Sequence, residues 1–233
     1  MPALIAFPRF PIDSERRYRL SSREKTTFHT VLDAKKLLDP TGEHPTSVKI
    51  TAEPDAVRLA FEYPLARGRI SEILTLRKTN EGLVSDQLVR SVFNTSATRV
   101  RHEETDFSDD TMPLPPQTYP EVALPFLLGW QPLDGKVRDL YAWINDRFVA
   151  RVEYLSKGKV ELELPRGRVP AIKVIMYPDF NDWVRLGKVL TKLSRPFAPK
   201  YNMWFAPEPP HQLLRFEGPY GPPGAPEVVM ELI

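Results

Sequence analysis

Along most of the chain, apolar and polar side chains alternate with a period of two. The clearest runs are residues 57–63, 148–154, 159–164 and 172–176. In the first run, Val57, Leu59, Phe61 and Tyr63 point one way and the intervening side chains point the other. A period of two with one charged face is typical of antiparallel strands that are exposed to water on one side. The pattern therefore predicts a mainly β protein.

Turn-forming sequences separate these runs. They are Thr41-Gly42, Glu53-Pro54-Asp55, Asn80-Glu81-Gly82, Lys157-Gly158 and Arg166-Gly167. Because Lys157-Gly158 is a turn signal, we expect residues 147–156 and 159–164 to form a hairpin. About a dozen strands are predicted, which is more than one compact sheet of a sandwich holds comfortably. We therefore expect curved antiparallel sheets that form a β-roll or an open half-barrel.

Two segments predict helices. A short helix over 120–128 is favoured by Pro120, which suits a first helical turn. A longer amphipathic helix is predicted over 181–193, where Trp183 and three leucines recur at helical spacing. We expect this second helix to cover the concave side or the mouth of the sheet.

Proline is unusually frequent, at 25 of 233 residues, and is concentrated in 113–126 and 196–226. Proline breaks strands and helices, so such segments connect elements. We expect a single β domain over 1–233, with two strand sets at about 14–107 and 137–233. A Pro-rich crossover near 112–126 would join them.

Composition excludes several classes of protein. With 32 basic and 30 acidic residues the net charge is +2, which argues against a nucleic-acid-binding protein. The chain has no cysteine, which excludes disulfides and thiolate metal sites. No apolar run is long enough to span a membrane. The N-terminus lacks a basic region and Pro8 interrupts its apolar run, so we expect a cytoplasmic protein, or an exported one if the sequence given had been trimmed.

Common catalytic motifs are absent from the sequence. It has no Gly-rich phosphate loop, no G-x-S-x-G elbow and no paired-histidine zinc motif. We expect no cofactor and no metal site.

The local cluster with the most candidate catalytic or metal-binding side chains consists of His102, Glu104 and Asp106. On a strand these three side chains share one face, where they could bind a divalent cation or act as acid and base. Consecutive charged residues are mostly exposed, so the alternative is a solvated strand face. With Glu217, these residues are the candidates for catalysis.

A second group predicts a binding site. Trp204, His211, Arg215 and Tyr220 lie close together in sequence, and aromatic side chains with a few polar groups are typical of ligand pockets. The basic residues Arg185 and Lys188 of the predicted helix would favour a ligand with an anionic head. The alternative is that Trp204 and Phe216 are buried core residues while Arg215 and Glu217 form an ion pair; we expect both aromatic residues to be core anchors in either case.

The C-terminal half resembles a known family. Residues 165–174 match the pattern P-x-G-x-x-x-A-x-x-V, a tryptophan-bearing strand follows at 202–205, and a Pro-rich step at 209–210 leads into the next strand. These features resemble an uncharacterised bacterial β family over about residues 115–233. The resemblance implies a spiral β-roll or an open half-barrel similar to lipoprotein carriers, mostly in exported proteins. This chain departs from the family in its N-terminus and in the Pro/Gly-rich run 216–224, and the resemblance implies no catalytic residues.

Three functions remain open from the sequence. The favoured hypothesis is a non-catalytic protein that binds an apolar or amphiphilic small molecule, because an open β half-barrel with an aromatic interior provides such a site. One alternative is an enzyme, of lyase or hydrolase type, whose acid and base converge from separate strands. The other is a scaffold whose Pro-rich loops bind another protein.

Overall fold

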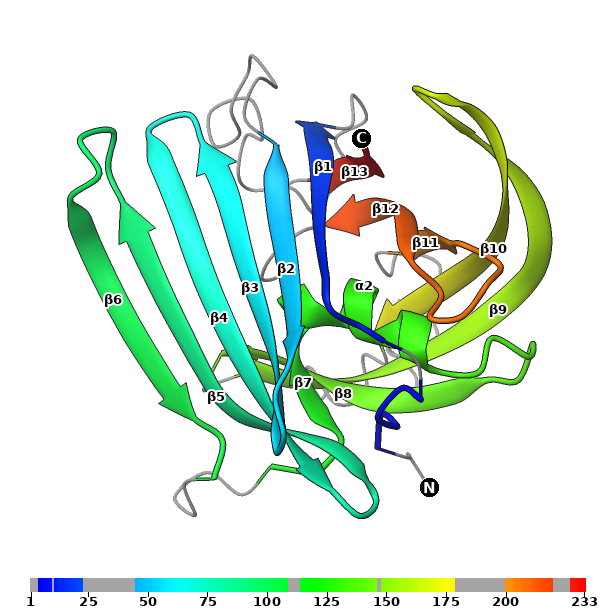
Figure 1. The fold of residues 1–233 in the computed structure, drawn as a ribbon, viewed down its shortest axis with the longest axis horizontal. Helices are drawn as coiled ribbons and strands as arrows, with labels where there is room; N and C mark the ends of the chain where they lie inside the picture. Colours follow the sequence, from blue (N-terminus) through cyan, green and yellow to red (C-terminus); the bar gives the residue numbers. More distant parts are fainter. Residues whose placement is uncertain are drawn as a thin grey trace, which may run out of the picture.

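A computed structural model of the chain describes residues 4–9, 11–22, 45–108, 114–145, 148–178, 200–219 and 227–233. The described strands form one curved sheet, which is open in shape (Figure 1). This confirms the expected mainly β fold with a curved, open sheet. The predicted helix over 181–193 and the Thr41-Gly42 turn lie outside the described residues.

The sheet has 13 strands in the order β6-β5-β4-β3-β2-β1-β13-β12-β11-β10-β9-β8-β7. Their bounds are β1 Ser14–Ser22, β2 Thr46–Ala52, β3 Ala56–Leu65, β4 Gly68–Thr79, β5 Gly82–Phe93, β6 Arg99–Asp106, β7 Thr118–Pro120, β8 Arg138–Asn145, β9 Phe148–Leu164, β10 Gly167–Pro178, β11 Tyr201–Phe205, β12 Leu213–Pro219 and β13 Glu227–Leu232. All neighbouring strands are antiparallel except β7 and β8, which are parallel. The first strand pairs with the last, so β1 and β13 join two runs of neighbouring strands.

Alternation along each strand builds the core. On β3, Val57, Leu59 and Phe61 are fully buried, whereas Arg58 between them is exposed. On β4 the buried partner of Leu59 is Leu74. The apolar side chains therefore gather on one face of the sheet, as the period of two predicts.

A short helical segment covers this apolar face (Figure 1). It consists of η1 Glu121–Ala123, α2 Leu124–Leu127 and η2 Leu128–Trp130. The ring of Phe126 lies 5.7 Å from the ring of Tyr18 on β1 and 5.5 Å from that of Phe61 on β3. The helix predicted over 120–128 is confirmed, and it fills the concave side. We call the sheet face toward this segment the inner face and the opposite one the outer face.

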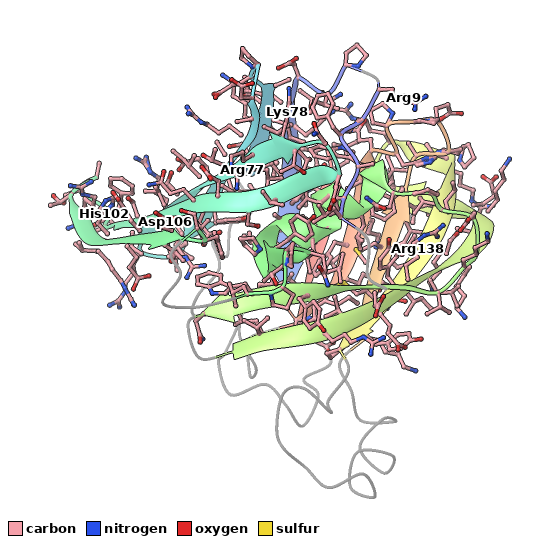
Figure 2. All side chains as sticks on the ribbon, turned by 90° about the horizontal axis from the view of Figure 1, so that it is seen from below. Arg9, Arg77, Lys78, His102, Asp106 and Arg138 are labelled. Carbon is pink, nitrogen blue, oxygen red and sulfur yellow. The ribbon has the colours of Figure 1, made fainter. Side chains whose placement is uncertain are left out.

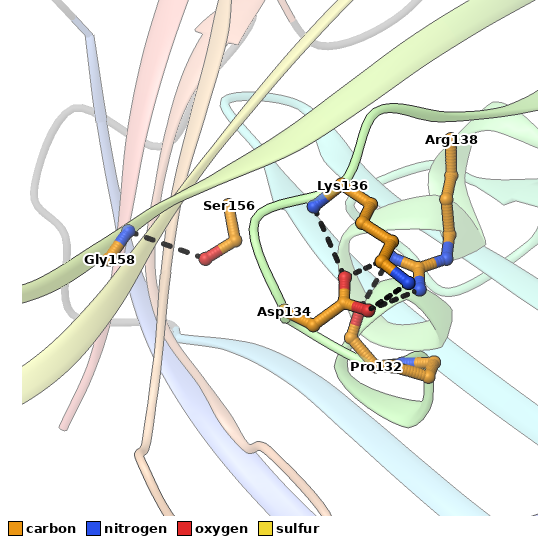
Figure 3. A network of polar contacts seen from close by, with 6 residues as sticks. All are labelled: Pro132, Asp134, Lys136, Arg138, Ser156 and Gly158. Atoms are coloured by element: carbon orange, nitrogen blue, oxygen red, sulfur yellow. Dashed lines mark hydrogen bonds and ion pairs between the residues drawn. The ribbon is translucent and has the colours of Figure 1, made fainter.

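The hairpin predicted at Lys157-Gly158 is wrong. Strand β9 runs without a break from Phe148 to Leu164, and Gly158 lies within it at φ +95°. The register against β10 shifts at this point, which marks a β-bulge, and Gly158 N donates a hydrogen bond to Ser156 Oγ at 3.4 Å (Figure 3). Glycine tolerates this left-handed conformation in a bulge as readily as in a turn, so the sequence signal could not distinguish the two. The chain reverses at Pro165 and Arg166 instead, and Gly167 pairs with Leu164.

Polar contacts also fix the loop between η2 and β8. Asp134 accepts hydrogen bonds from Arg138 Nη1 at 2.6 Å and Nη2 at 2.9 Å, and its other donor is the backbone of Lys136 (Figure 3). The guanidinium of Arg138 holds the pKa of Asp134 well below its ordinary value. The bidentate geometry holds Arg138, the first residue of β8, against the preceding loop.

The strands at one end of the sheet curve round to meet β5. Thr118 O on β7 accepts a hydrogen bond from Ser85 Oγ on β5 at 2.8 Å. The buried hydroxyl of Tyr119 donates to Leu83 O at 2.6 Å and accepts from Ile5 N at 2.9 Å. These side-chain contacts tie β7 to β5, while β6 extends beyond them. None of the helices within the described residues could span a membrane.

Candidate functional site

A pocket of about 580 Å³ lies where four parts of the fold meet. These parts are the first half of β1, the end of β13, the loop between β11 and β12, and the tip of the β9–β10 hairpin. Figure 1 shows how strongly this hairpin curves. The pocket is lined by Glu15, Arg16, Arg17, Arg166, Gln212, Leu232 and Ile233.

Backbone pairing brings these residues together. The N–H of Ile233 donates to Arg17 O at 3.1 Å, which extends the β1–β13 ladder to the pocket wall. Across the loop, Ala206 N donates to Gln212 O at 2.7 Å. Arg166 lies in the turn between β9 and β10, directly before Gly167, so the curvature of the hairpin decides where its side chain lies. No local sequence pattern predicts this pocket, because its residues are distant along the chain.

The pocket carries an excess of positive charge. Three basic residues, Arg16, Arg17 and Arg166, line the pocket together with one acidic residue, Glu15. Within the described part of the chain, none of the three guanidinium groups lies within ion-pair distance of a carboxylate; Arg16 Nη1 donates to the backbone oxygen of Glu15 at 2.9 Å. All three arginines are exposed. Guanidinium groups without a protein carboxylate are suited to bind a carboxylate or phosphate from solution.

An apolar cluster adjoins the pocket. Leu162, Ala171 and Leu214 are buried together, with Trp204 and Leu232 packed against them. Leu232 also lines the pocket, so the basic pocket and the apolar cluster share a wall. The cluster forms because the curved hairpin places Leu162 of β9 against β11–β13.

Trp204 belongs to this second cluster rather than to the main core. Its neighbours Met203 and Phe205 are fully buried in the main core, and the period of two turns Trp204 to the outer face. Trp204, expected to be a core anchor, is half-buried and packs against this second cluster; the apolar run 203–205 does not show which of its residues point inward. For Phe216, which is 2% exposed, the same expectation is confirmed.

Arg215 lies beside Trp204 with its charge compensated. The guanidinium carbon lies 5.6 Å from the Trp204 ring centre, and Lys173 Nζ lies 5.1 Å from the same ring. Arg215 forms ion pairs with Glu217 and, at 2.9 Å, with Glu231. The structure therefore brings Trp204, Arg215 and Glu217 together, in the ion-paired arrangement that the sequence left as the alternative.

The other predicted binding residues are not joined to this group by described contacts. His211 lies in the loop between β11 and β12, where its Nδ1 is 2.9 Å from Ala206 O. Its neighbour Gln212 lines the pocket. Arg185, Lys188 and Tyr220 lie outside the described residues.

His102 and Glu104 share the outer face of β6, as the sequence predicts. His102 Nε2 is 2.9 Å from Glu104 Oε1, and Nδ1 is 3.0 Å from Ser91 Oγ on β5. A carboxylate only accepts hydrogen bonds, so His102 donates to Glu104 from Nε2. The order serine–histidine–carboxylate resembles that of a catalytic triad, in which the serine is the nucleophile. Only 9% of the Ser91 surface is exposed, which argues against that role. The contacts explain the orientation of the ring.

The other two catalytic candidates, Asp106 and Glu217, make different contacts or lie elsewhere in the sheet. Asp106 ends β6 and accepts hydrogen bonds from Ser108 N at 2.8 Å and Ser108 Oγ at 2.7 Å, which lower its pKa. Glu217 is on β12, beyond β1 and β13 in the sheet order. Among the described residues, no group of three or more acidic or histidine side chains is arranged to hold a metal ion.

A second polar group, missed in the sequence, lies on the inner face. Glu72 on β4 is 3% exposed and forms an ion pair with Arg90, its cross-strand partner on β5. Glu121 of η1 approaches this pair. Burial raises the pKa of Glu121 to about 8; the nearby Glu72 carboxylate adds to the increase and Arg90 opposes it. For Glu72 burial also raises the pKa, against the effect of Arg90. A sequence signal existed, since Glu72 occupies an inward position in the alternation that Leu74 and Leu76 continue.

The chain matches no protein-family model and no curated protein. Among solved structures it is similar to the β-barrel-like protein of a domain of unknown function, DUF1849, from Brucella abortus. The match has a TM-score of 0.52 and 9% sequence identity, and it covers 94% of each chain. Similarity at this identity shows a shared fold. It agrees with the expected resemblance to an uncharacterised β family.

Proposed function

We propose that this protein binds a small amphiphilic molecule with an anionic head, and that the head lies in the pocket lined by Arg16, Arg17 and Arg166. The observation that carries the proposal is that three exposed arginines, none ion-paired within the described residues, line one pocket of about 580 Å³. Pockets for small ligands commonly enclose about 300–1,000 Å³. The volume therefore suits a ligand of ordinary size.

The apolar part of the ligand would lie toward Leu232 and Ile233. Leu232 connects the pocket to the cluster that contains Trp204 and Leu214. Guanidinium groups provide orientation through paired hydrogen bonds, and apolar area provides affinity. A fatty acid or a related lipid combines the two features.

Titration with a fluorescent fatty acid tests the proposal. Wild type should bind it saturably, and the double variant Arg17→Ala/Arg166→Ala should bind at least tenfold more weakly. The matched control is Arg168→Ala, on the same hairpin, because Arg168 is exposed and lies outside the pocket lining. A fluorescent fatty alcohol should bind wild type and the double variant alike, since it lacks the anionic head.

Arg215→Ala separates this pocket from the neighbouring tryptophan site. Arg215 is already bound to two carboxylates, so its removal should leave the affinity for the fatty acid within about threefold of wild type. Absence of saturable binding to wild type would refute the proposed function. Equal binding to wild type and to Arg17→Ala/Arg166→Ala would move the ligand away from this pocket.

A further inference from the structure

Strand β6 is an open edge of the sheet. It stands at one end of the strand order and pairs with β5, and among the described residues no strand lies on its other side. The opposite end of the order is different: β7 has three residues and is tied to β5 through Thr118 and Ser85. Figure 2 shows His102 and Asp106 of β6 at one extremity of the molecule. An open edge presents backbone N–H and C=O groups that can pair with another strand.

The charges along β6 are divided between its two ends. Arg99 and Arg101 lie in the first half, and Glu103, Glu104 and Asp106 in the second. Two antiparallel copies of such a strand place the basic half of each against the acidic half of the other. The sequence is therefore complementary to itself in the antiparallel direction.

Symmetry restricts the register. A two-fold axis that relates two antiparallel edge strands is perpendicular to the sheet, so residues opposite each other must lie on the same face. Arg101 and Glu103 share the inner face because they pair with Val92 and Arg90 on β5. One allowed register sets Arg101 of each copy opposite Glu103 of the other, with the two His102 residues facing each other at the axis.

We propose that β6 binds a second copy of this chain in that register, so that the two sheets become continuous. Arg101 and Glu103 already form an ion pair within one strand, and Arg90 on β5, the cross-strand partner of Glu103, lies near the same carboxylate. In the dimer each guanidinium lies between the Glu103 of its own strand and that of the second copy. Opposite charges across an antiparallel pair stabilise it, and like charges destabilise it.

Charges and bulges on edge strands also serve to prevent pairing. The bulge on β6 lies at Val100, between the positions that face Phe93 and Val92, so residues 101–106 remain regular. An edge strand that charge alone protects from pairing needs side chains of only one charge sign. The division into a basic and an acidic half instead favours one partner, a second copy of itself.

Charge reversal provides the decisive experiment. Sedimentation equilibrium of the full chain over a range of concentrations should show a reversible dimer for wild type. Arg101→Glu and Glu103→Arg should each raise the dissociation constant at least tenfold, because each sets like charges opposite one another. The double variant Arg101→Glu/Glu103→Arg restores opposite signs and should dimerise like wild type. Arg58→Glu, an exposed change on β3, should leave the dimer unchanged.

A cysteine variant tests the register independently. The chain has no cysteine, so His102→Cys introduces a single thiol. Directly opposite residues of antiparallel strands have Cβ atoms about 4.5–5.5 Å apart, close to the spacing that a disulfide needs. Mild oxidation should give a covalent dimer of His102→Cys and little of Arg58→Cys. A monomeric wild type, a dimer insensitive to both charge reversals, or equal cross-linking of the two cysteine variants would overturn the proposal.

Discussion

The hydroxyl of Tyr119 donates a hydrogen bond to the backbone oxygen of Leu83 at 2.6 Å, and this contact joins β7, the last strand of the sheet order, to β5, the second strand from its other end. The same hydroxyl accepts a hydrogen bond from Ile5 N. One fully buried side chain thus holds three segments that are far apart in sequence. Burial raises the pKa of this hydroxyl to about 12, so it stays protonated and able to donate at neutral pH.

Tyr119→Phe should destabilise the fold by about 1–3 kcal/mol, because the Leu83 carbonyl and the Ile5 amide lose their partner in a buried place. Urea denaturation followed by circular dichroism measures the change. Tyr141→Phe is the control, since Tyr141 is partly exposed on β8, and it should change stability by less than about 0.5 kcal/mol. A Tyr119→Phe variant as stable as wild type would show that the contact does not hold β7 against β5.

Glu121→Gln should change how stability depends on pH. The pKa of Glu121 is about 8 in the folded protein against an ordinary value of 4.5, so between these values the folded state binds a proton that the unfolded state has lost. This group therefore stabilises the fold most at low pH, and its contribution falls as the pH rises toward 8. Glutamine does not titrate. The variant should lose less stability than wild type over this range, by up to about 1.4 kcal/mol for each pH unit.

Thermal or urea unfolding at several pH values provides the measurement for Glu121→Gln. Glu81→Gln, at the exposed turn between β4 and β5, is the control and should follow the wild-type profile. Parallel profiles for wild type and Glu121→Gln would mean that the carboxyl is not desolvated beside Glu72.

Phe216→Ala and Trp204→Ala should differ in cost. Phe216 is buried in the main core, and its truncation should cost about 3–5 kcal/mol. Trp204 is half-buried on the outer face, so Trp204→Ala should cost clearly less. Chemical denaturation of both variants under one set of conditions compares them. An equal loss of unfolding free energy in both variants would show that Trp204 contributes as much to the core as Phe216 does.

Gly129→Ala should destabilise the fold although alanine is the better helix former. A Cβ at this position would lie 2.0 Å from the backbone oxygen of His211, so η2 or the β11–β12 loop must move. We expect a loss of about 1–3 kcal/mol from this overpacking, against a propensity gain of at most about 1 kcal/mol. Differential scanning calorimetry measures the sum, and a raised melting temperature would show that the loop yields easily.

Local sequence patterns predicted the strands of the sheet better than they predicted the candidate functional site. Alternation along residues 57–63 correctly predicted an inward apolar face, because that signal depends only on neighbours in one strand. The pocket depends on the curvature of the β9–β10 hairpin, which sets Arg166 near Arg17, and no local pattern encodes that curvature. The bulge at Gly158 shows the same limit, since glycine marks a left-handed residue without saying whether the chain turns back or continues.

The pairing of β1 with β13 has a consequence for synthesis on the ribosome. The strands β1 to β6 can begin to pair as they emerge, but β1 receives its second neighbour only when residues 227–232 leave the exit tunnel. Until then a nascent chain carries an unsatisfied strand edge in the middle of its future sheet. Contacts between such distant residues form slowly. The chain therefore completes its fold only late in translation. Before that point, the unpaired edge of β1 in the nascent chain is a target for chaperones.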